Sequence, residues 1–150
     1  MQMADYFSDY EIHIYCSCDV VELNNLLNPR NVFIHKNIEK CEHYYLDSKL
    51  IISRAGRNTI SELLCLEIPS IIIPAGDDFR AKEQAVNSEQ AKKANSRLIK
   101  ISHQNTTIDT LVSTCQNILT SNSNKPSMKW QCGNLEAENL ILKLYKSKMK

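Results

Sequence analysis

Glycine is scarce in this sequence, since only Gly56, Gly76 and Gly133 occur among its 150 residues. The G-x-G-x-x-G loop and the Walker loop both need closely spaced glycines, so neither can form anywhere in the chain. These loops are the common devices for holding a nucleotide phosphate. A phosphate would therefore have to bind at another kind of turn, and Gly56 is the glycine that joins an apolar run directly to a helical pattern.

The sequence also lacks the spacing by which cysteine and histidine usually bind metals. Its six cysteines include no C-x-x-C pair, and its four histidines are far apart along the chain. A secreted disulfide scaffold would be shorter and richer in cysteine. We therefore expect buried, reduced thiols, with neither a metal site nor a cofactor.

Neither sign of charge dominates, and no apolar run is long. The formal net charge is +1, and Lys and Arg are spread along the chain apart from residues 146–150, which argues against nucleic acid as a partner. No stretch approaches the roughly 20 apolar residues of a membrane-spanning helix, and residues 1–5 do not resemble a signal peptide. With 43% apolar residues, the sequence predicts one cytoplasmic, globular domain over residues 1–150.

The periodicity of apolar residues predicts strands that alternate with helices. Strands are expected at residues 11–16, 31–34, 49–53, 70–73 and 98–101. Helices are expected at residues 20–27, 38–46, 58–66, 81–94, 107–119 and 135–148, with a Ser/Asn-rich linker at 120–126 before the last one. This order predicts an α/β fold, a Rossmann-like doubly wound parallel sheet that binds ligands at the carboxyl ends of its strands.

The clearest functional signal lies where the third strand meets its helix. The run Ser53-Arg54-Ala55-Gly56 follows an apolar strand, and a helical pattern opens directly after it. The N–H groups and the positive dipole end of a helix N-terminus attract phosphate. The sequence therefore predicts a phosphorylated ligand at the Gly56 turn, with residues 75–82 at the same edge of the sheet.

The run LIISRAGRNTISELLCLEIPSIIIPAGDDFRAKEQAVNS, over residues 50–88, resembles a known family. Its strand, its S/R-x-G-x-x-T-x-x-E turn, its Pro-terminated apolar strand and its Q-x-x-N pair are similar to the C-terminal, donor-binding half of GT-B glycosyltransferases of family 28. This is the group that contains the peptidoglycan N-acetylglucosaminyltransferase. The resemblance implies a UDP-sugar as donor substrate, no separate cofactor, and transfer of a hexosyl group, an N-acetylhexosamine in these relatives.

The resemblance also implies roles for residues near the turn. Ser53, Arg54, Gly56, Asn58 and Thr59 match the segment that contacts the diphosphate, although Arg54 could equally be a surface arginine. Glu62 matches the glutamate that accepts hydrogen bonds from the ribose hydroxyls. Thr59 and Glu62 also fit a T-x-x-E capping box, which would give both residues a purely structural role.

Further positions match the ends of the donor site. Ile38 matches the residue whose backbone contacts the uracil, and its alternative role is that of a core isoleucine. Glu83, Gln84 and Asn87 match the polar group that binds hydroxyls of the transferred sugar, and their alternative role is a solvated helix face. Asp77, Asp78 and Arg80 make a loop more charged than that of the relatives and have no assigned role.

The chain departs from the family at its beginning, so a truncated GT-B half is expected. Residues 1–10 resemble the tail of the helix that should follow a first strand and Gly-rich loop, and the N-terminal half, which supplies the acceptor site and catalytic base, has no counterpart. Three interpretations follow. The chain is a donor-binding domain or subunit that needs a companion half, part of a nucleotide-sugar hydrolase, or a non-catalytic remnant that binds a protein through an exposed sheet edge. If the protein is recruited to a membrane, we expect a partner to recruit it.

Overall fold

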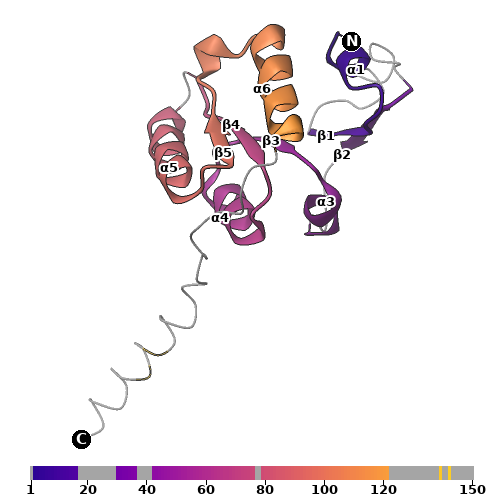
Figure 1. Cartoon of the computed structure of the whole chain (residues 1–150). Coiled ribbons are helices and arrows are strands. Elements are labelled where there is room, and N and C mark those ends of the chain that lie inside the picture. The colour runs from indigo at the N-terminus through magenta and orange to yellow at the C-terminus, as the bar shows by residue number, and fades with distance from the viewer. Residues whose placement is uncertain are drawn as a thin grey trace, which may run out of the picture.

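Parallel strands covered by helices on both faces form the body of the protein in a computed structural model (Figure 1). The structure describes residues 2–16, 30–36, 42–76 and 79–121, together with residues 139 and 142. All strand pairs in these ranges are parallel. The predicted α/β class and Rossmann-like arrangement are therefore confirmed.

The strands form two sheets. In the first, β1 (Ile12–Cys16) pairs with β2 (Val32–Lys36), and Ile12 lies opposite Val32. In the second, the order is β3 (Ile51–Arg54), β4 (Ser70–Ile73), β5 (Leu98–Lys100). The central strand β4 is buried along Ser70, Ile71 and Ile72, as its continuous apolar run predicts for the interior of a parallel sheet.

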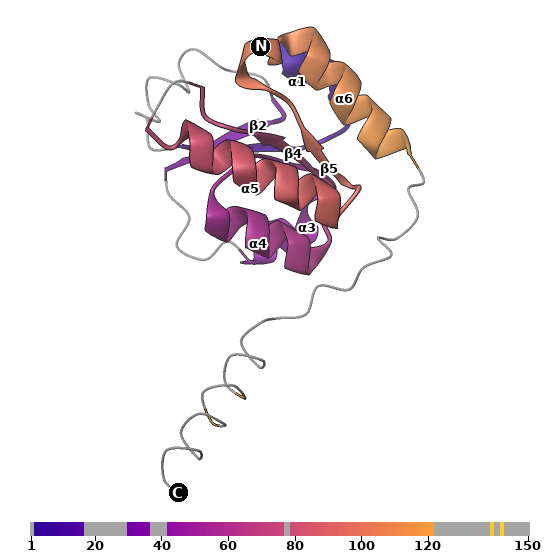
Figure 2. The ribbon, with the colours of Figure 1, turned by 90° about the vertical axis from the view of Figure 1, so that its left-hand side faces the viewer.

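Two helical layers enclose these strands (Figure 2). On one side, α4 (Arg57–Leu66) packs against α5 (Ala81–Ala94), and α3 (Glu42–Asp47) contacts α4. On the other side, α1 (Gln2–Tyr6) contacts α6 (Ile108–Thr120), and the short 3-10 helix η1 (His103–Asn105) precedes α6.

Each layer has its own apolar core. The core under α4 and α5 contains Ala55, Ile60, Leu63, Leu64, Ile72, Ala91 and Leu98. The core under α1 and α6 contains Phe7, Ile71, Ile101, Val112 and Cys115. Burial of each leucine, isoleucine, valine or phenylalanine among them contributes about 1.5–3 kcal/mol, so these two clusters hold the helices on the sheet.

A single amide ties the N-terminal segment to the first sheet. Asn31 Nδ2 lies 3.3, 3.0 and 3.1 Å from the carbonyl oxygens of Ala4, Phe7 and Tyr10, to which it donates. Asn31 also accepts the backbone N–H of Ile12 at 2.8 Å. The segment from α1 to β1 is thereby fixed beside β2, since the two N–H hydrogens of one side chain are shared among three backbone carbonyls.

Most element predictions agree with the structure, and one feature differs. The strands and helices described lie within a few residues of the predicted ones, and Ser70–Ile73 and Ala81–Ala94 match at both ends. The predicted helix at 20–27, the first residues of the helix at 38–46, most of the linker at 120–126 and nearly all of the helix at 135–148 lie outside the described residues. The difference is that the expected single sheet is divided between β1 and β3. In the described part of the chain, no helix is long and apolar enough to cross a membrane.

Candidate functional site

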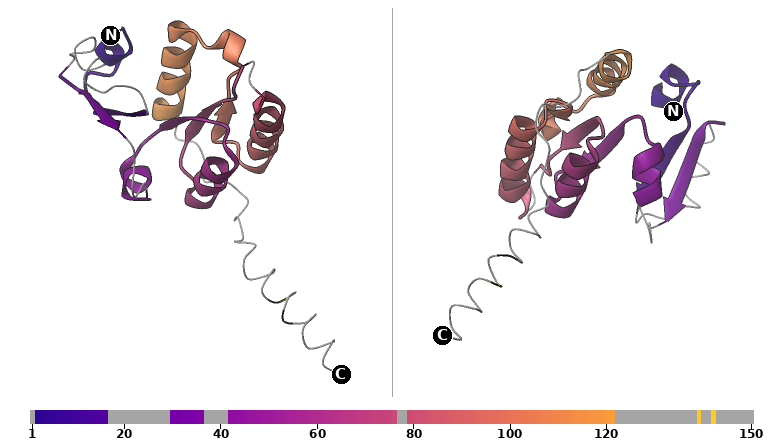
Figure 3. Two further views of the ribbon diagram at one scale, coloured as in Figure 1. Left: turned by 180° about the vertical axis from the view of Figure 1, so that it is seen from behind. Right: turned by 60° about the horizontal axis from the view of Figure 1, so that its bottom comes forward.

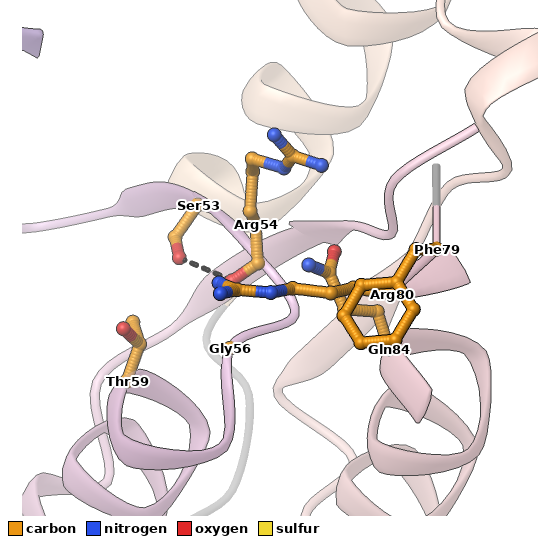
Figure 4. Close-up of a pocket in the computed structure, with 7 residues that line it drawn as sticks. All are labelled: Ser53, Arg54, Gly56, Thr59, Phe79, Arg80 and Gln84. Carbon is orange, nitrogen blue, oxygen red and sulfur yellow. Dashed lines mark hydrogen bonds between the residues drawn. The ribbon is translucent and has the colours of Figure 1, made fainter. Parts of the chain in front are cut away.

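An open pocket of about 420 Å³ lies at the carboxyl ends of β3 and β4 (Figure 4). Its walls come from the end of β3, the start of α4 and the segment that leads into α5. The lining residues are Ser53, Arg54, Gly56, Thr59, Phe79, Arg80 and Gln84. The pocket thus lies at the edge of the sheet where the sequence predicted a ligand, and five of its residues were predicted to bind one.

The N-terminus of α4 opens onto this pocket. Gly56 is the N-cap residue, and its carbonyl oxygen accepts the N–H of Ile60 at 2.9 Å. As a glycine, the N-cap residue has no side chain with which to cap the helix. The first N–H groups of a helix have no partner within it, so those of α4 are oriented to donate to a ligand in the pocket.

The capping-box interpretation of Thr59 and Glu62 is wrong. Thr59 is the third helical residue rather than the N-cap, because α4 begins at Arg57. The helix extends further towards the strand than the apolar pattern alone indicated. Thr59 lines the pocket instead, and Glu62 lies exposed one turn further along α4.

The missing side chain of Gly56 leaves space for a ligand. Its backbone is extended, with φ −67° and ψ 140°, which any residue can adopt. A Cβ atom added there would meet only Thr59 Oγ1, at 3.7 Å. Backbone strain therefore does not require glycine here, and the hydrogen on Cα lets a ligand approach the backbone closely.

Gln84 forms the wall opposite the Gly56 turn. Its side chain lies inward with a residue exposure of only 8%, and its Oε1 atom accepts the backbone N–H of Ala75 at 2.8 Å. This bond joins the first turn of α5 to the loop after β4. For Gln84 the alternative of a solvated helix face is wrong, because the side chain is buried at the pocket with its amide orientation fixed.

Two cationic side chains line the pocket. Arg54 comes from the end of β3 and Arg80 from the start of α5, and their side chains extend in different directions (Figure 4). Nearby, Arg57 Nη2 pairs with Glu83 Oε1 at 3.0 Å, which connects α4 to α5. None of the seven lining residues is acidic. The pocket therefore favours an anion, and guanidinium groups suit phosphate oxygens.

The other predicted site residues that the structure describes are not among those lining the pocket. Asn58 is exposed at the start of α4, and Glu83 is engaged with Arg57. Asn87 is half-buried one turn beyond Gln84 on α5, and its Nδ2 atom is buried with no hydrogen-bond partner within the described ranges. Ile38 lies outside the described residues, as do Asp77 and Asp78.

Two pocket residues, Phe79 and Arg80, were not predicted as part of the site. The Phe79 side chain is almost fully in solvent, with a residue exposure of 96%. An aromatic residue within a polar loop, directly before a helix at the ligand edge, is the signal that could have identified it. Across the described residues, no three His, Cys, Asp or Glu side chains gather as a metal site.

Comparison with known proteins identifies similar sequences. The family model for the glycosyltransferase family 28 C-terminal domain matches residues 11–144. A relative from Bacillus cereus is 29% identical over 140 residues, which cover 90% of this chain and 36% of that protein. One from Oceanobacillus iheyensis is 41% identical over 87 residues, or 58% of this chain and 24% of that protein.

Both relatives carry the name UDP-N-acetylglucosamine–N-acetylmuramyl-(pentapeptide) pyrophosphoryl-undecaprenol N-acetylglucosamine transferase. The chain thus spans only about a third or less of the length of these two proteins, given the matched 36% and 24%. About two thirds or more of each relative therefore lies outside the region that matches this chain.

Proposed function

Since the chain belongs to glycosyltransferase family 28, as its C-terminal domain, we propose that it binds the UDP-sugar donor of a hexosyl transfer reaction. The observation that carries this proposal is the convergence of the uncapped α4 N-terminus, Arg54, Arg80 and Gln84 on one pocket. The sugar proposed is an N-acetylhexosamine, because the names of the two relatives specify UDP-N-acetylglucosamine.

The diphosphate is proposed to lie against the Gly56 turn. The N–H groups at the start of α4 and the hydroxyl of Thr59 would donate to its oxygens. The hydroxyl of Ser53 donates to the carbonyl oxygen of Arg54 at 2.7 Å and would have to turn to donate to the ligand. Arg54 and Arg80 supply the positive charge that compensates the two phosphates. The same charges would stabilise the UDP leaving group, whose negative charge grows as the bond to the sugar breaks.

The ribose, the uracil and the sugar of the donor are each assigned to residues other than those proposed for the diphosphate. Glu62 is proposed to accept hydrogen bonds from the ribose hydroxyls, since it follows Thr59 by three residues on the same side of α4. The backbone at Ile38 is proposed to contact the uracil. Gln84, Asn87 and Glu83 are proposed to bind sugar hydroxyls, and the Asn87 Nδ2 atom, which has no partner among the described residues, supports a role as a donor.

Catalysis is proposed to need a companion half. Transfer to an acceptor hydroxyl needs a general base, and none of the seven residues that line the pocket is a histidine or a carboxylic acid. The matched region covers 36% of the Bacillus cereus relative. We therefore assign acceptor binding and the base to a part of the enzyme beyond residues 1–150, and any membrane recruitment to that part as well.

Calorimetric titration with UDP and with UDP-N-acetylglucosamine tests the proposal. Gln84→Ala is the diagnostic variant, and Gln90→Ala, which removes an exposed glutamine from the same helix, is the matched control. We expect both ligands to bind the natural chain, and Gln84→Ala to weaken the sugar nucleotide more than UDP. Absence of binding at millimolar ligand in a folded sample would overturn the proposal and favour an interaction module.

A further inference from the structure

Phe79 stands directly before α5, at a position where an apolar side chain often supports the start of a helix. Arg80 is the N-cap residue of α5, and an apolar residue just before the N-cap commonly packs against the fourth helical residue. That residue is Gln84, whose side-chain oxygen accepts the N–H of Ala75. Phe79 is 96% exposed, so its ring is not packed there. Support of the helix start therefore does not explain this aromatic residue.

Phe79 instead lies where two helices begin beside the pocket. α4 and α5 lie side by side on one face of the larger sheet, and both begin at its carboxyl edge (Figure 3). Gly56 and Thr59 line the pocket from the start of α4, and Phe79 and Gln84 line it from the start of α5. Figure 4 shows the same division, with the Phe79 ring on the side of Gln84. The ring is therefore part of the α5 wall.

Phe79 differs chemically from the other residues of the pocket. Of the seven residues that line it in the described part of the chain, Phe79 alone carries an apolar side chain. The hydroxyl, amide and guanidinium groups of the others suit phosphate and hydroxyl oxygens. An aromatic ring gains most when it covers apolar surface, and its electron-rich face attracts weakly positive C–H groups. Phe79 thus indicates a ligand that has an apolar surface as well as polar groups.

A sugar nucleotide has two surfaces of this kind. One is the uracil ring, and the other is the face of the pyranose ring that carries C–H groups. The nucleoside is proposed to contact Ile38 and Glu62, and Glu62 lies one turn beyond Thr59 on α4. The sugar is proposed to bind Gln84, which shares the α5 wall with Phe79. The pyranose ring is therefore the apolar surface that comes closest to Phe79.

We propose that Phe79 packs its ring against the C–H face of the transferred sugar, while Gln84 binds hydroxyls of the same sugar. This inference rests on the proposed function, which supplies the position of the sugar. Contact between the ring and the sugar removes apolar surface of both from water. UDP has no sugar and gains nothing from this contact. Phe79 therefore makes the site prefer the donor over the nucleotide that remains after transfer.

Calorimetric titration of the full chain with UDP and with UDP-N-acetylglucosamine tests this role. Phe79→Ala should weaken binding of the sugar nucleotide about five- to tenfold, as expected for the loss of an aromatic contact, and should leave UDP binding within about twofold. Phe79→Tyr keeps the ring and should stay within about twofold of the natural chain for both ligands. Val86→Ala is the matched control, because Val86 is 55% exposed on α5 and does not line the pocket.

Nuclear Overhauser contacts between the protein and the ligand locate the ring directly. The sequence contains three phenylalanines, so a deuterated chain with protonated phenylalanine gives few aromatic signals. Phe7 is buried under α6, and Phe33 lies on β2 in the other sheet. With UDP-N-acetylglucosamine bound, we expect contacts from one phenylalanine ring to C–H protons of the pyranose. These contacts should be absent in Phe79→Ala at saturating ligand.

The other outcomes overturn the inference and separate it from the donor-binding proposal. Contacts from Phe79 to the uracil protons, or an equal loss of affinity for both ligands in Phe79→Ala, would place the ring at the nucleoside. Unchanged binding of both ligands in Phe79→Ala would leave the ring to the acceptor or to the companion half. In these cases UDP binds the natural chain, so the donor-binding proposal stands. Absence of binding of both ligands to the natural, folded chain would overturn the two proposals together.

Discussion

The side-chain carbonyl of Gln84 accepts the backbone N–H of Ala75 at 2.8 Å, and this bond fixes the wall of the pocket before any ligand is present. It joins two segments nine residues apart, the loop after β4 and the first turn of α5. The Gln84 amide nitrogen is the atom proposed to donate to a bound sugar. One buried residue therefore connects the fold to the proposed recognition of the donor.

This bond makes Gln84→Ala a stability probe as well as a binding probe. We expect the free energy of unfolding to fall by about 1–3 kcal/mol, because the Ala75 N–H loses its partner in a partly buried position. Gln90→Ala, on the exposed face of the same helix, should change it by less than about 0.5 kcal/mol. Urea denaturation of the three proteins measures both values. Equal losses in the two variants would contradict the role assigned to the Gln84–Ala75 bond.

Gly56→Ala should preserve the fold and damage the pocket. The backbone angles of Gly56 suit alanine, so the stability should change by less than about 1 kcal/mol, as the entropy gain and the weaker N-cap oppose each other. The added methyl group would occupy the space beside Thr59, and UDP should bind at least about tenfold more weakly, a loss of about 1.4 kcal/mol.

Gly76→Ala is the contrasting variant. A Cβ atom there would lie 2.6 Å from Cδ2 of His103, so this substitution should destabilise the protein through a steric clash. Thermal unfolding and UDP titration of both variants give the comparison. If Gly56→Ala lost stability while its folded form bound UDP normally, glycine at this turn would serve the fold alone.

The outcome for Thr59 and Gly56 shows what the sequence could and could not predict. Apolar runs such as Ser70–Ile73 identified the strands because burial dictates their composition. The sequence pattern Thr-x-x-Glu suggested Thr59 as the N-cap because it considers only neighbouring residues. The start of α4 is instead set by the packing of Ile60 and Leu63 on the sheet. The division between β1 and β3 depends on pairing between distant segments, which periodicity does not report. Phe79 and Arg80 enter the pocket only through the position of α5.

Glu62 should matter for binding and little for stability. Glu62 does not cap α4 and is exposed on it, so Glu62→Gln should change the free energy of unfolding by less than about 0.5 kcal/mol. UDP binding should weaken by about 1–3 kcal/mol, since the ribose hydroxyls lose an ionised acceptor. A UDP analogue without ribose hydroxyls should bind the natural protein and Glu62→Gln equally well. A full effect of the variant on that analogue would place Glu62 elsewhere in the site.

Arg80 should contribute to diphosphate binding more than Arg57 does. Both arginines are exposed, but Arg80 lines the pocket, whereas Arg57 is not among its lining residues and pairs with Glu83 at 3.0 Å. Arg80→Ala should weaken UDP by about five- to tenfold at low salt and make its affinity less dependent on salt, because an exposed charge is screened. Arg57→Ala is the control, because it removes the same charge from the start of α4. Titrations with UDP at two salt concentrations compare the variants. Equal losses of affinity would assign the effect to the overall positive charge of the region rather than to contact between Arg80 and the diphosphate.

The free thiols of Cys65 and Cys115 should differ in reactivity. Cys115 is buried under α6, and burial raises the pKa of its thiol, whereas Cys65 is exposed on α4. The thiolate is the form that reacts with iodoacetamide, so at pH 8 Cys65 should be alkylated well before Cys115, as followed by peptide mass mapping. In urea the two should react at similar rates.

The same pKa shift predicts how stability depends on pH. The folded state binds the Cys115 proton more tightly than the unfolded chain does, so this group should not affect stability below the unfolded thiol pKa of about 8.5. Above that pH the unfolded state gains a thiolate first, and the free energy of unfolding should fall as pH rises. Urea melts between pH 7 and 10 test this sign, and Cys115→Ala should flatten that part of the curve. An unchanged slope in the variant would assign the loss of stability to other groups.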